Sequence, residues 1–425
     1  MEKIRITNFL LIKELDIELK RINVFIGPQA QGKSIVAKLI KFFKEIPLSL
    51  SNSIAHGKES MEFRSHQLSK FNKMFPEQYW IHTVFNIEYS NKYFSINLIK
   101  DDIDSTLQIN FSNSLLSAEN SARTFNTMLL EEEERRISEE ETASEPVPKR
   151  IMLEEIRRIF VEKLFNECEN PSVDRVFYVP AGRSFFANLQ KNIFSFINSD
   201  IKIDYFLTEF GSIYENVKDL RRHSFIKEST PKLVNDYFES LIKGSFVVED
   251  GEDWIVGDNG KINVINSSSG QQEALPMALV MSIWPYIELR LVSKSFIIEE
   301  PEAHLFPSAQ GEMTSLIANA YNYNSNTSII ITTHSPYILS ALNVCIQAKN
   351  TLIDNPDKSE LVHRIVPQSE LIDHKDVSAF LINDGAAKNI FDEELNLIDA
   401  SEIDNISNIF ANRYDDLLDI QFGED

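Results

Sequence analysis

Residues 27–34 read GPQAQGKS, the pattern G-x-x-x-x-G-K-[ST] of a phosphate-binding loop. An apolar run at 22–26 precedes this loop, and a helical pattern at 35–43 follows it. In a strand–loop–helix unit, backbone N–H groups converge on the β- and γ-phosphates of a nucleotide. Lys33 would add a positive charge there, and the Ser34 hydroxyl would ligate Mg²⁺. The sequence therefore predicts an ATP site made by Gly27, Gln29, Gln31, Gly32, Lys33, Ser34 and Ile35.

Two later apolar runs end in residues that could support hydrolysis. The run at 296–298 ends in the adjacent carboxylates Glu299 and Glu300, and the run at 328–333 ends at His334. We expect Glu299 to hold the Mg²⁺ shell and Glu300 to orient or deprotonate the attacking water. A neutral imidazole at His334 could hydrogen-bond the γ-phosphate or that water. These residues predict an ATPase.

A second anion site is predicted at 267–273, SSSGQQE, between an expected strand and an expected helix. Serine hydroxyls, a glycine and a helix N-terminus together favour an anion. Because 27–34 already supply one phosphate site, we interpret this loop as half of a composite site that another subunit completes. The alternative is a plain helix N-cap followed by a turn. The residues expected to act in trans are Ser268, Ser269, Gly270 and Gln271.

Composition excludes several classes of protein. The chain has 425 residues, of which 43% are hydrophobic and 25% charged, as in a water-soluble globular protein. We expect no membrane partner, because no apolar run reaches the roughly 18 residues of a membrane span. Charges within the first apolar stretch exclude a signal peptide. The two cysteines lie far apart in the sequence and form no metal or disulfide pattern, so we expect a cytoplasmic protein.

The net charge of −22 means that most of the surface should repel DNA, because contacts with DNA phosphates need lysine and arginine. Direct DNA binding would require a local basic patch. Each candidate group is more often a solvated helix face than a DNA contact. The candidates are Lys149 with Arg150, Arg157 with Arg158, and Arg221 with Arg222 and His223.

The elements that must position these residues follow from the hydrophobic pattern. Residues 1–45 predict strand, strand, loop and helix, and 80–111 predict an antiparallel hairpin with a further strand. Residues 244–266 predict a β-meander with DG and NG turns. Residues 271–292 predict a helix that Pro276 and Pro285 disturb.

The remaining stretches divide the chain. Residues 112–172 are rich in acid and helix formers, and Pro146 and Pro148 break them into two expected helices. Residues 185–243 also look helical. We therefore expect a discontinuous ATPase head at 1–111, 173–184 and 244–425, an acidic helical insertion at 112–172, and a helical subdomain at 185–243.

Taken in chain order, these motifs resemble the ABC-class ATPase heads of the SMC, Rad50 and RecF type. In SSSGQQ, Ser268 falls on the signature serine, Gly270 falls on its second glycine, and Ser269 replaces the first glycine. The resemblance implies an α/β P-loop ABC-type head with a mixed sheet, an antiparallel β-subdomain and helical insertions. It implies a homodimer or higher homo-oligomer that sandwiches ATP and Mg²⁺.

The same resemblance assigns roles to the acidic and histidine strands. Glu299 matches the Walker B acid, with Glu in place of the usual Asp. Glu300 matches the catalytic glutamate and His334 the switch histidine. Gln67 is the candidate for the Q-loop glutamine. Arg183, in PAGRS, could approach a phosphate or be a structural arginine.

Three segments, EEPEAHLFP, SSGQQEALP and FYVPAGRS, are similar to the ATPases of the OLD-like group. Members of that group often continue into a Toprim nuclease, but the residues after His334 contain no Glu plus Asp-x-Asp arrangement. The chain thus resembles the stand-alone ATPase subunits of anti-phage systems such as PARIS and Septu. This implies a sensor or switch that controls a separate effector, either a toxin or a nuclease of the Toprim or HNH type.

Three alternative functions and one alternative interpretation of two residues remain at this stage. A DNA-repair ATPase of the RecF or Rad50 type would bind DNA tightly, a transporter subunit would need a coupling surface for a membrane partner, and a scaffold would bind nucleotide without turnover. His304 with Glu302 suggests a metal site, but no third ligand is evident. The loop following the Walker B strand at a dimer seam is the better interpretation of these two residues.

Overall fold

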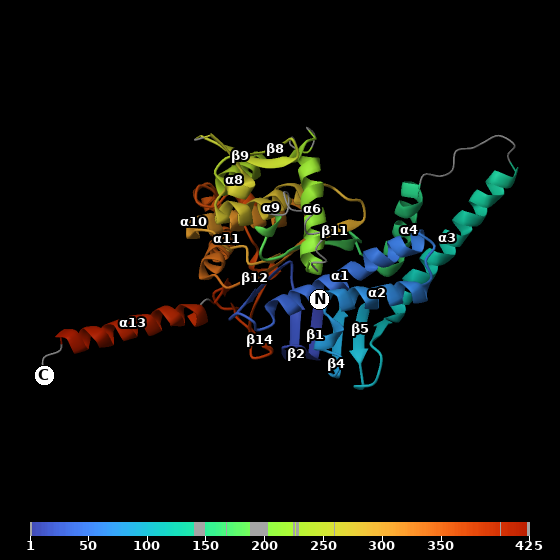
Figure 1. The fold of residues 1–425 in the computed structure, drawn as a ribbon, viewed down its shortest axis with the longest axis horizontal. Helices are drawn as coiled ribbons and strands as arrows, with labels where there is room; N and C mark the ends of the chain where they lie inside the picture. The colour runs from blue at the N-terminus through green and yellow to red at the C-terminus, as the bar shows by residue number, and fades with distance from the viewer. Residues whose placement is uncertain are drawn as a thin grey trace.

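Two sheets with a helix layer between them position the candidate residues, as Figure 1 shows. The computed structural model describes residues 2–139, 149–166, 168–187, 203–223, 226, 229–258, 260–399 and 401–422. Helices α1 (Lys33–Ala55) and α2 (Ser60–Met74) lie between the sheets, and a second group of helices covers the far face of the larger sheet.

The larger sheet is mixed and has the strand order β14-β13-β3-β12-β11-β7. Its strands are parallel except for β14, which pairs antiparallel with β13. The central strands are apolar and buried on both faces, as parallel strands covered by helices on both sides must be. The bounds are β3 Ile22–Ile26, β7 Val173–Val179, β11 Val292–Glu299, β12 Thr327–Thr333, β13 Val377–Asn383 and β14 Ala386–Asn389.

The second sheet is antiparallel, with the order β2-β1-β4-β5-β6. Its strands alternate between buried and more exposed residues, because only one face packs on the core. The bounds are β1 Glu2–Phe9, β2 Ile12–Leu19, β4 Phe85–Ser90, β5 Ser95–Lys100 and β6 Gln108–Phe111. The expected mixed sheet and antiparallel β-subdomain are therefore confirmed.

Two hydrophobic cores meet at the larger sheet. Phe25 and Ile297 face the core around α1 and the antiparallel sheet, whereas Val24 and Ile298 face the core around the second helix group. That group comprises α6 Tyr205–Arg221, α8 Lys232–Ile242, α9 Ser269–Ile283, α10 Pro307–Tyr323 and α11 Pro336–Asp354. This alternation sets α1 and α9 on opposite faces of the sheet that carries the candidate site.

The remaining elements are peripheral to the site. The predicted β-meander is confirmed by β8 Ser245–Glu249, β9 Glu252–Gly257 and β10 Gly260–Asn263. The other helices and strands are α3 Asn113–Glu139, α4 Lys149–Leu164, α12 Ser359–His363, α13 Ser401–Phe422, β15 Phe391–Asp392 and β16 Leu397–Ile398. Short 3₁₀ turns cover Glu77–Tyr79, Val264–Asn266, Trp284–Tyr286, Pro356–Lys358, Gln368–Glu370 and His374–Asp376.

The structure corrects two expected boundaries. Residues 1–45 contain three strands rather than two, since β1 and β2 form a hairpin before β3. The sequence did not predict this hairpin, because its turn contains no glycine or proline. The helix predicted at 271–292 ends at Ile283, and a 3₁₀ turn with Pro285 near its start leads into β11. Pro276 lies inside α9 and does not end it.

Some expectations are not decided by these elements. Helices α3 and α4 occupy the predicted insertion at 112–172, but Pro146 and Pro148 lie outside the described residues. The division into a discontinuous head, an insertion and a helical subdomain stays a prediction. Among the described residues, no helix has the length and apolar character needed to cross a membrane.

Candidate functional site

A cavity of about 240 Å³ lies where the loop between β3 and α1 meets the carboxyl ends of β11 and β12. Parallel pairing places β12 between β3 and β11, so three segments from distant parts of the chain converge there. This edge of an open α/β sheet is the usual position of a ligand site. The lining residues are Leu11, Gln29, Ala30, Gln31, Gly32, Lys33, Ser34, Ile35, Glu300, Thr332 and His334.

Both glycines of the loop are required by its conformation. Gly27 has φ +146°, and a Cβ there would lie 2.2 Å from the Ile382 carbonyl oxygen. Gly32 has φ +99°, and a Cβ there would lie 2.6 Å from Ile12 Cδ1. The loop is thus packed against the backbone of β13 at Gly27 and against the end of the Ile12 side chain at Gly32, and the positive φ of both residues favours glycine.

Lys33 lies at the start of α1 and folds back over the loop. Its Nζ donates hydrogen bonds to the carbonyl oxygens of Gly27, at 2.8 Å, and Pro28, at 2.6 Å. Burial lowers the pKa of the Lys33 amino group, and the carboxylates of Glu300 and Glu302 offset part of this effect. Lys33 is therefore a cation next to the cavity whose present partners are neutral carbonyls that a phosphate could replace.

Glu299 and Glu300 point to different surroundings although they are adjacent. Glu299 ends β11 and is buried, and its Oε2 accepts a hydrogen bond from the Ala181 N–H at 3.3 Å. Its Oε1 is buried near the Tyr178 hydroxyl, and burial together with the Glu299 carboxylate raises the pKa of that hydroxyl. Carboxylate and hydroxyl oxygens are ligand types that Mg²⁺ takes, and Ser34 is exposed in the neighbouring cavity. Glu299 is not among the residues that line the cavity, and its pairing with Ser34 around Mg²⁺ stays a prediction.

The turn at Glu300 has an unusual backbone conformation. Glu300 has φ +45°, which is uncommon for a residue other than glycine. The Glu300 N–H donates to the Thr332 carbonyl at 2.8 Å, and the Glu300 carbonyl accepts from the Ala303 N–H at 3.0 Å. The turn directs the half-exposed Glu300 side chain to the cavity, whereas Glu299 stays below.

His334 follows β12 and lies beside Glu300. Its Nε2 is 3.5 Å from Glu300 Oε1, and its backbone N–H donates to Glu302 Oε1 at 2.6 Å. A third carboxylate, Glu302, thus fixes the backbone that carries the histidine. The loop, Glu300 and His334 thus line one cavity.

A family model described as an AAA ATPase domain matches residues 1–339, which is most of the chain. This chain belongs to the AAA ATPase domain family. No curated protein matches the sequence significantly.

Three solved structures are similar to this AAA ATPase at low sequence identity. An SMC head bound to the C-winged helix domain of ScpA is 12% identical, covering 91% of this chain and 96% of that chain, with a TM-score of 0.41. The SMC head domain from Thermotoga maritima is 11% identical over 91% and 97% of the chains, with a TM-score of 0.38. The recombination mediator protein RecF is 13% identical over 91% and 97%, with a TM-score of 0.29.

The Ser-Gly-Gln loop of this ATPase domain does not contribute to the P-loop cavity. Ser268 caps α9, its hydroxyl accepts from the Gln271 N–H, and the Gln271 side chain accepts from the Ser268 N–H. Gln271 also donates to the Ile242 carbonyl, so it supports the loop. Ser268 and Ser269 remain exposed at the helix N-terminus. The loop thus forms a helix N-cap in which the Ser268 hydroxyl accepts from the Gln271 N–H and donates to Gln271 Oε1, while both serines lie at the surface.

Arg183 is fully buried, and its guanidinium reaches no surface. It donates to the carbonyl oxygens of Pro180, Glu299 and Glu300 at 2.7–3.0 Å, and to the Glu273 carbonyl at 3.2 Å. This geometry supports the structural alternative for Arg183 over contact with a phosphate.

Other predicted candidates lie away from the cavity. Gln67 is buried in α2 and donates to the Ser49 hydroxyl, so it is not placed as a nucleotide-sensing glutamine. Arg158 pairs with Glu155 and Glu162, and Arg222 pairs with Asp219, which compensates their charge. The side chains of Lys149 and Arg150 lie outside the described residues. In the described part of the chain, no group of three or more acidic, histidine or cysteine side chains forms a metal site, and His304 is exposed.

The structure adds residues that the sequence pattern did not single out. Leu11 and Thr332 line the cavity, and the Asp384 N–H donates to Gln31 Oε1 at 2.9 Å. Asp384 belongs to the turn between β13 and β14, far from the loop in the chain, so local sequence carries no signal for this contact. Glu302 was considered above only together with His304, whereas the structure shows it accepting the His334 N–H.

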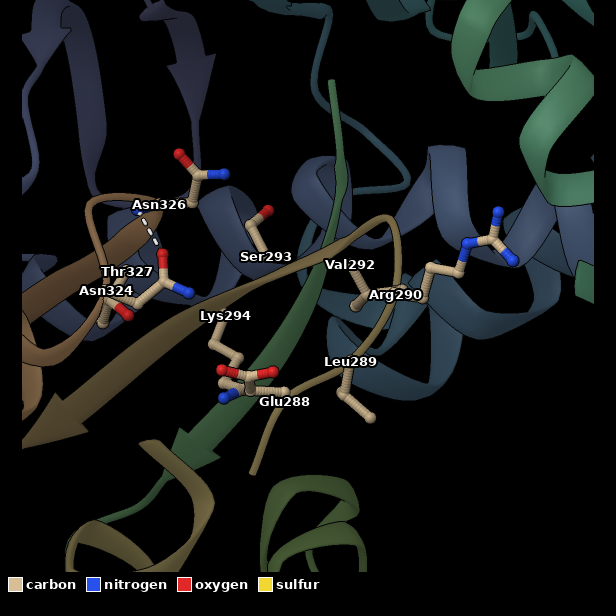
Figure 2. Close-up of a pocket in the computed structure, with 9 residues that line it drawn as sticks. All are labelled: Glu288, Leu289, Arg290, Val292, Ser293, Lys294, Asn324, Asn326 and Thr327. Atoms are coloured by element: carbon tan, nitrogen blue, oxygen red, sulfur yellow. Dashed lines mark hydrogen bonds between the residues drawn. The ribbon is translucent and has the colours of Figure 1, made fainter. Parts of the chain in front are cut away.

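A second cavity, of about 590 Å³, lies at the opposite ends of β11 and β12 (Figure 2). It contains no glycine-rich loop. Its buried Lys294 donates to the Pro285 carbonyl at 2.8 Å, and burial lowers the pKa of the Lys294 amino group to about 8. The lining is mostly polar, and none of its residues belongs to the phosphate-binding loop.

Proposed function

We propose that this AAA ATPase domain binds ATP with Mg²⁺ between two protomers, hydrolyses it, and acts as the switch subunit of an anti-phage complex that controls a separate effector. The observation that carries the ATPase part is the cavity that brings together the P-loop, Glu300 and His334. A cation, a carboxylate and an imidazole around a loop of N–H donors match the requirements of phosphoryl transfer to water.

Each side chain has a defined task in this proposal. Lys33 exchanges its loop carbonyls for phosphate oxygens, while the loop N–H groups hold the β- and γ-phosphates. Glu300 orients the water and accepts its proton, and His334 hydrogen-bonds the γ-phosphate or the water. Ser34 and Glu299 would hold Mg²⁺, which neutralises charge on the transferring group.

The proposal of two protomers rests on what one protomer's cavity lacks. Ser268, Ser269 and Gly270 are not among its lining residues, although their helix N-terminus favours an anion. A partner's loop placed over the γ-phosphate would complete the site. ATP would then stabilise the closed dimer, and hydrolysis would release it.

Helix α13 supports the proposal of a separate effector. Figure 1 shows this helix extending away from the rest of the molecule, and Tyr414, Leu417, Ile420 and Phe422 on it are exposed. Asp415, Asp416 and Asp419 lie on the same helix in a chain of net charge −22. We propose that the apolar residues enter a groove with a basic rim on the effector, because two copies of this acidic helix placed side by side would bring like charges together.

The test is the mass of the purified complex with ATP and Mg²⁺, for wild type and Glu300→Gln, alone and co-expressed with the protein encoded by the neighbouring gene. We expect an ATP-dependent oligomer that persists in the variant and retains the neighbour. An oligomer without a partner, but with salt-sensitive DNA binding, would instead favour the DNA-repair alternative. The absence of ATP-dependent assembly in both proteins would contradict the composite site.

A further inference from the structure

One buried arginine connects the catalytic turn to the helix that begins with the Ser-Gly-Gln loop. Arg183 Nη1 donates to the Glu299 carbonyl at 2.7 Å, and Nη2 donates to the Glu300 carbonyl at 3.0 Å. These two acceptors are the peptide groups on either side of the left-handed Glu300 residue. The guanidinium therefore holds the conformation that directs the Glu300 carboxylate into the cavity.

The same arginine is held from α9. The Glu273 carboxylate accepts from the Arg183 N–H at 2.9 Å and the Ser184 N–H at 3.0 Å, and it lies 3.5 Å from Arg183 Nε. Arg183 Nε also donates to the Glu273 carbonyl at 3.2 Å. Glu273 is almost fully buried in the first turns of α9, shortly after the helix cap Ser268.

A direct contact joins the same two regions. A Cβ on Gly270 would lie 2.9 Å from the His304 carbonyl oxygen, so the first turn of α9 packs tightly on the turn that follows Glu300. The start of α9 cannot shift without displacing either this turn or the groups that hold Arg183, because close-packed interiors transmit such shifts.

We propose that Arg183 is a positioning residue that couples the start of α9 to Glu300, so that contact of α9 with a partner's ATP adjusts the catalytic turn of its own protomer. This inference rests on the proposed composite ATP site. Each protomer offers Glu300 to its own nucleotide and the Ser268–Gly270 loop to its partner's nucleotide. The Glu273–Arg183–Glu300 connection, with Glu273 on α9 and Glu300 after β11, thus makes hydrolysis at one site depend on occupancy of the other.

The first test compares wild type with Arg183→Lys and Glu273→Gln in ATP titrations. Lysine keeps the charge but lacks the fork that reaches both carbonyls, and glutamine keeps the shape but loses the charge that holds Arg183. We expect each variant to bind a fluorescent ATP analogue within about twofold of wild type while kcat falls at least about tenfold. The Hill coefficient for hydrolysis should exceed one in wild type and approach one in the variants.

A matched control separates coupling from loss of fold. Glu370 is a buried carboxylate that accepts from the hydroxyls of Tyr237 and Ser315, away from the P-loop cavity. Glu370→Gln should lower thermal stability without changing kcat or the Hill coefficient. If Arg183→Lys does not fold, the kcat and Hill coefficient of Glu273→Gln alone test the coupling. A kcat within about twofold of wild type, or a reduced kcat with an unchanged Hill coefficient, would overturn the coupling.

A second readout does not need turnover. With a non-hydrolysable ATP analogue, amide hydrogen exchange should slow in wild type both at 269–273 and at 299–304. In Glu273→Gln, the protection at 269–273 should remain, whereas that at 299–304 should be weaker than in wild type, because only the protomer's own nucleotide would still protect it. If wild type shows this exchange pattern but does not hydrolyse ATP, the proposed hydrolysis is contradicted and the coupling is not. Protection at 299–304 that is as strong in Glu273→Gln as in wild type would overturn the coupling.

Discussion

Glu300 and His334 come from the ends of adjacent parallel strands, and His334 Nε2 lies 3.5 Å from Glu300 Oε1. The two groups are close enough to hydrogen-bond one shared water molecule. Both line the cavity that Lys33 also lines. This arrangement gives a carboxylate and an imidazole at the place where a γ-phosphate on the P-loop would be attacked.

Replacing the proposed base should separate binding from hydrolysis. We expect Glu300→Gln to lower kcat by about 10²-fold or more, because the amide cannot accept the proton of the water. ATP binding should remain, since the loop and Lys33 are unchanged. Steady-state phosphate release and nucleotide titration check this. Glu288→Gln, at the opposite end of the sheet, is the control, and a normal rate in Glu300→Gln would refute the assigned role.

Removing the loop cation should weaken nucleotide binding. We expect Lys33→Ala to lower affinity for ATP by about ten- to a hundredfold, which corresponds to the loss of a hydrogen bond to a charged group. Titration with a fluorescent ATP analogue measures the dissociation constant. The control is Lys58→Ala, because Lys58 is an exposed lysine that follows α1 and pairs with Glu62 at the surface. An unchanged dissociation constant in Lys33→Ala would place the triphosphate elsewhere.

A methyl group at Gly27 should destabilise the fold more than one at Gly57. Both residues have positive φ, but a Cβ at Gly27 would collide with the Ile382 carbonyl, whereas nothing lies within 4 Å of a Cβ at Gly57. Backbone strain alone costs about 1–2 kcal/mol, and we expect Gly27→Ala to exceed Gly57→Ala by at least about 1 kcal/mol. Urea unfolding compares the two variants. Equal losses of unfolding free energy in the two variants would show that β13 moves away from the added methyl group without a loss of stability.

Stability should depend on pH through Lys294, which lies in the second cavity (Figure 2). Burial lowers its pKa to about 8 in the folded chain, so between pH 8 and about 10 the unfolded chain binds more protons at this group. The free energy of unfolding should therefore rise with pH relative to Lys294→Met. The slope should stay below about 1.4 kcal/mol per pH unit, because one lysine can differ by at most one bound proton between the two states.

Below pH 8 the difference between wild type and Lys294→Met should be constant, because the lysine is then protonated in both the folded and the unfolded chain. Urea unfolding from about pH 7 to about pH 10 measures the difference. A flat difference throughout that range would contradict the lowered pKa.

Helix α13 should be needed for the partner but not for ATP hydrolysis. Leu417→Asp with Ile420→Asp introduces charge among its exposed apolar residues. We expect this variant to lose the co-expressed neighbour while kcat stays within about twofold of wild type, because α13 lies away from the cavity. Asn412→Asp on the same helix is the control. Retention of the neighbour by the double variant would exclude α13 as its binding element.

The local sequence was sufficient for the phosphate loop and for the two strands that end in acid and histidine. Gly27, Gly32 and Lys33 belong to a short motif that specifies the backbone conformation of the loop. The apolar runs before Glu299 and His334 indicate buried parallel strands. The hairpin of β1 and β2 was missed because its turn, at Leu10 and Leu11, contains none of the residues that usually mark turns.

Only the tertiary structure decided which of these residues meet and which do not. Strand order in a parallel sheet depends on packing between distant segments, so the placement of β12 between β3 and β11 has no local signal. Burial likewise distinguishes two candidate glutamines. Gln67 is buried among its neighbours, whereas the side chain of Gln31 lines the cavity.

The sequence by itself determined the chemistry of the phosphate loop, because that chemistry resides in consecutive backbone groups. The connection from Glu273 through Arg183 to Glu300 exists only in the folded chain, because it requires three distant segments to exclude water around one charge.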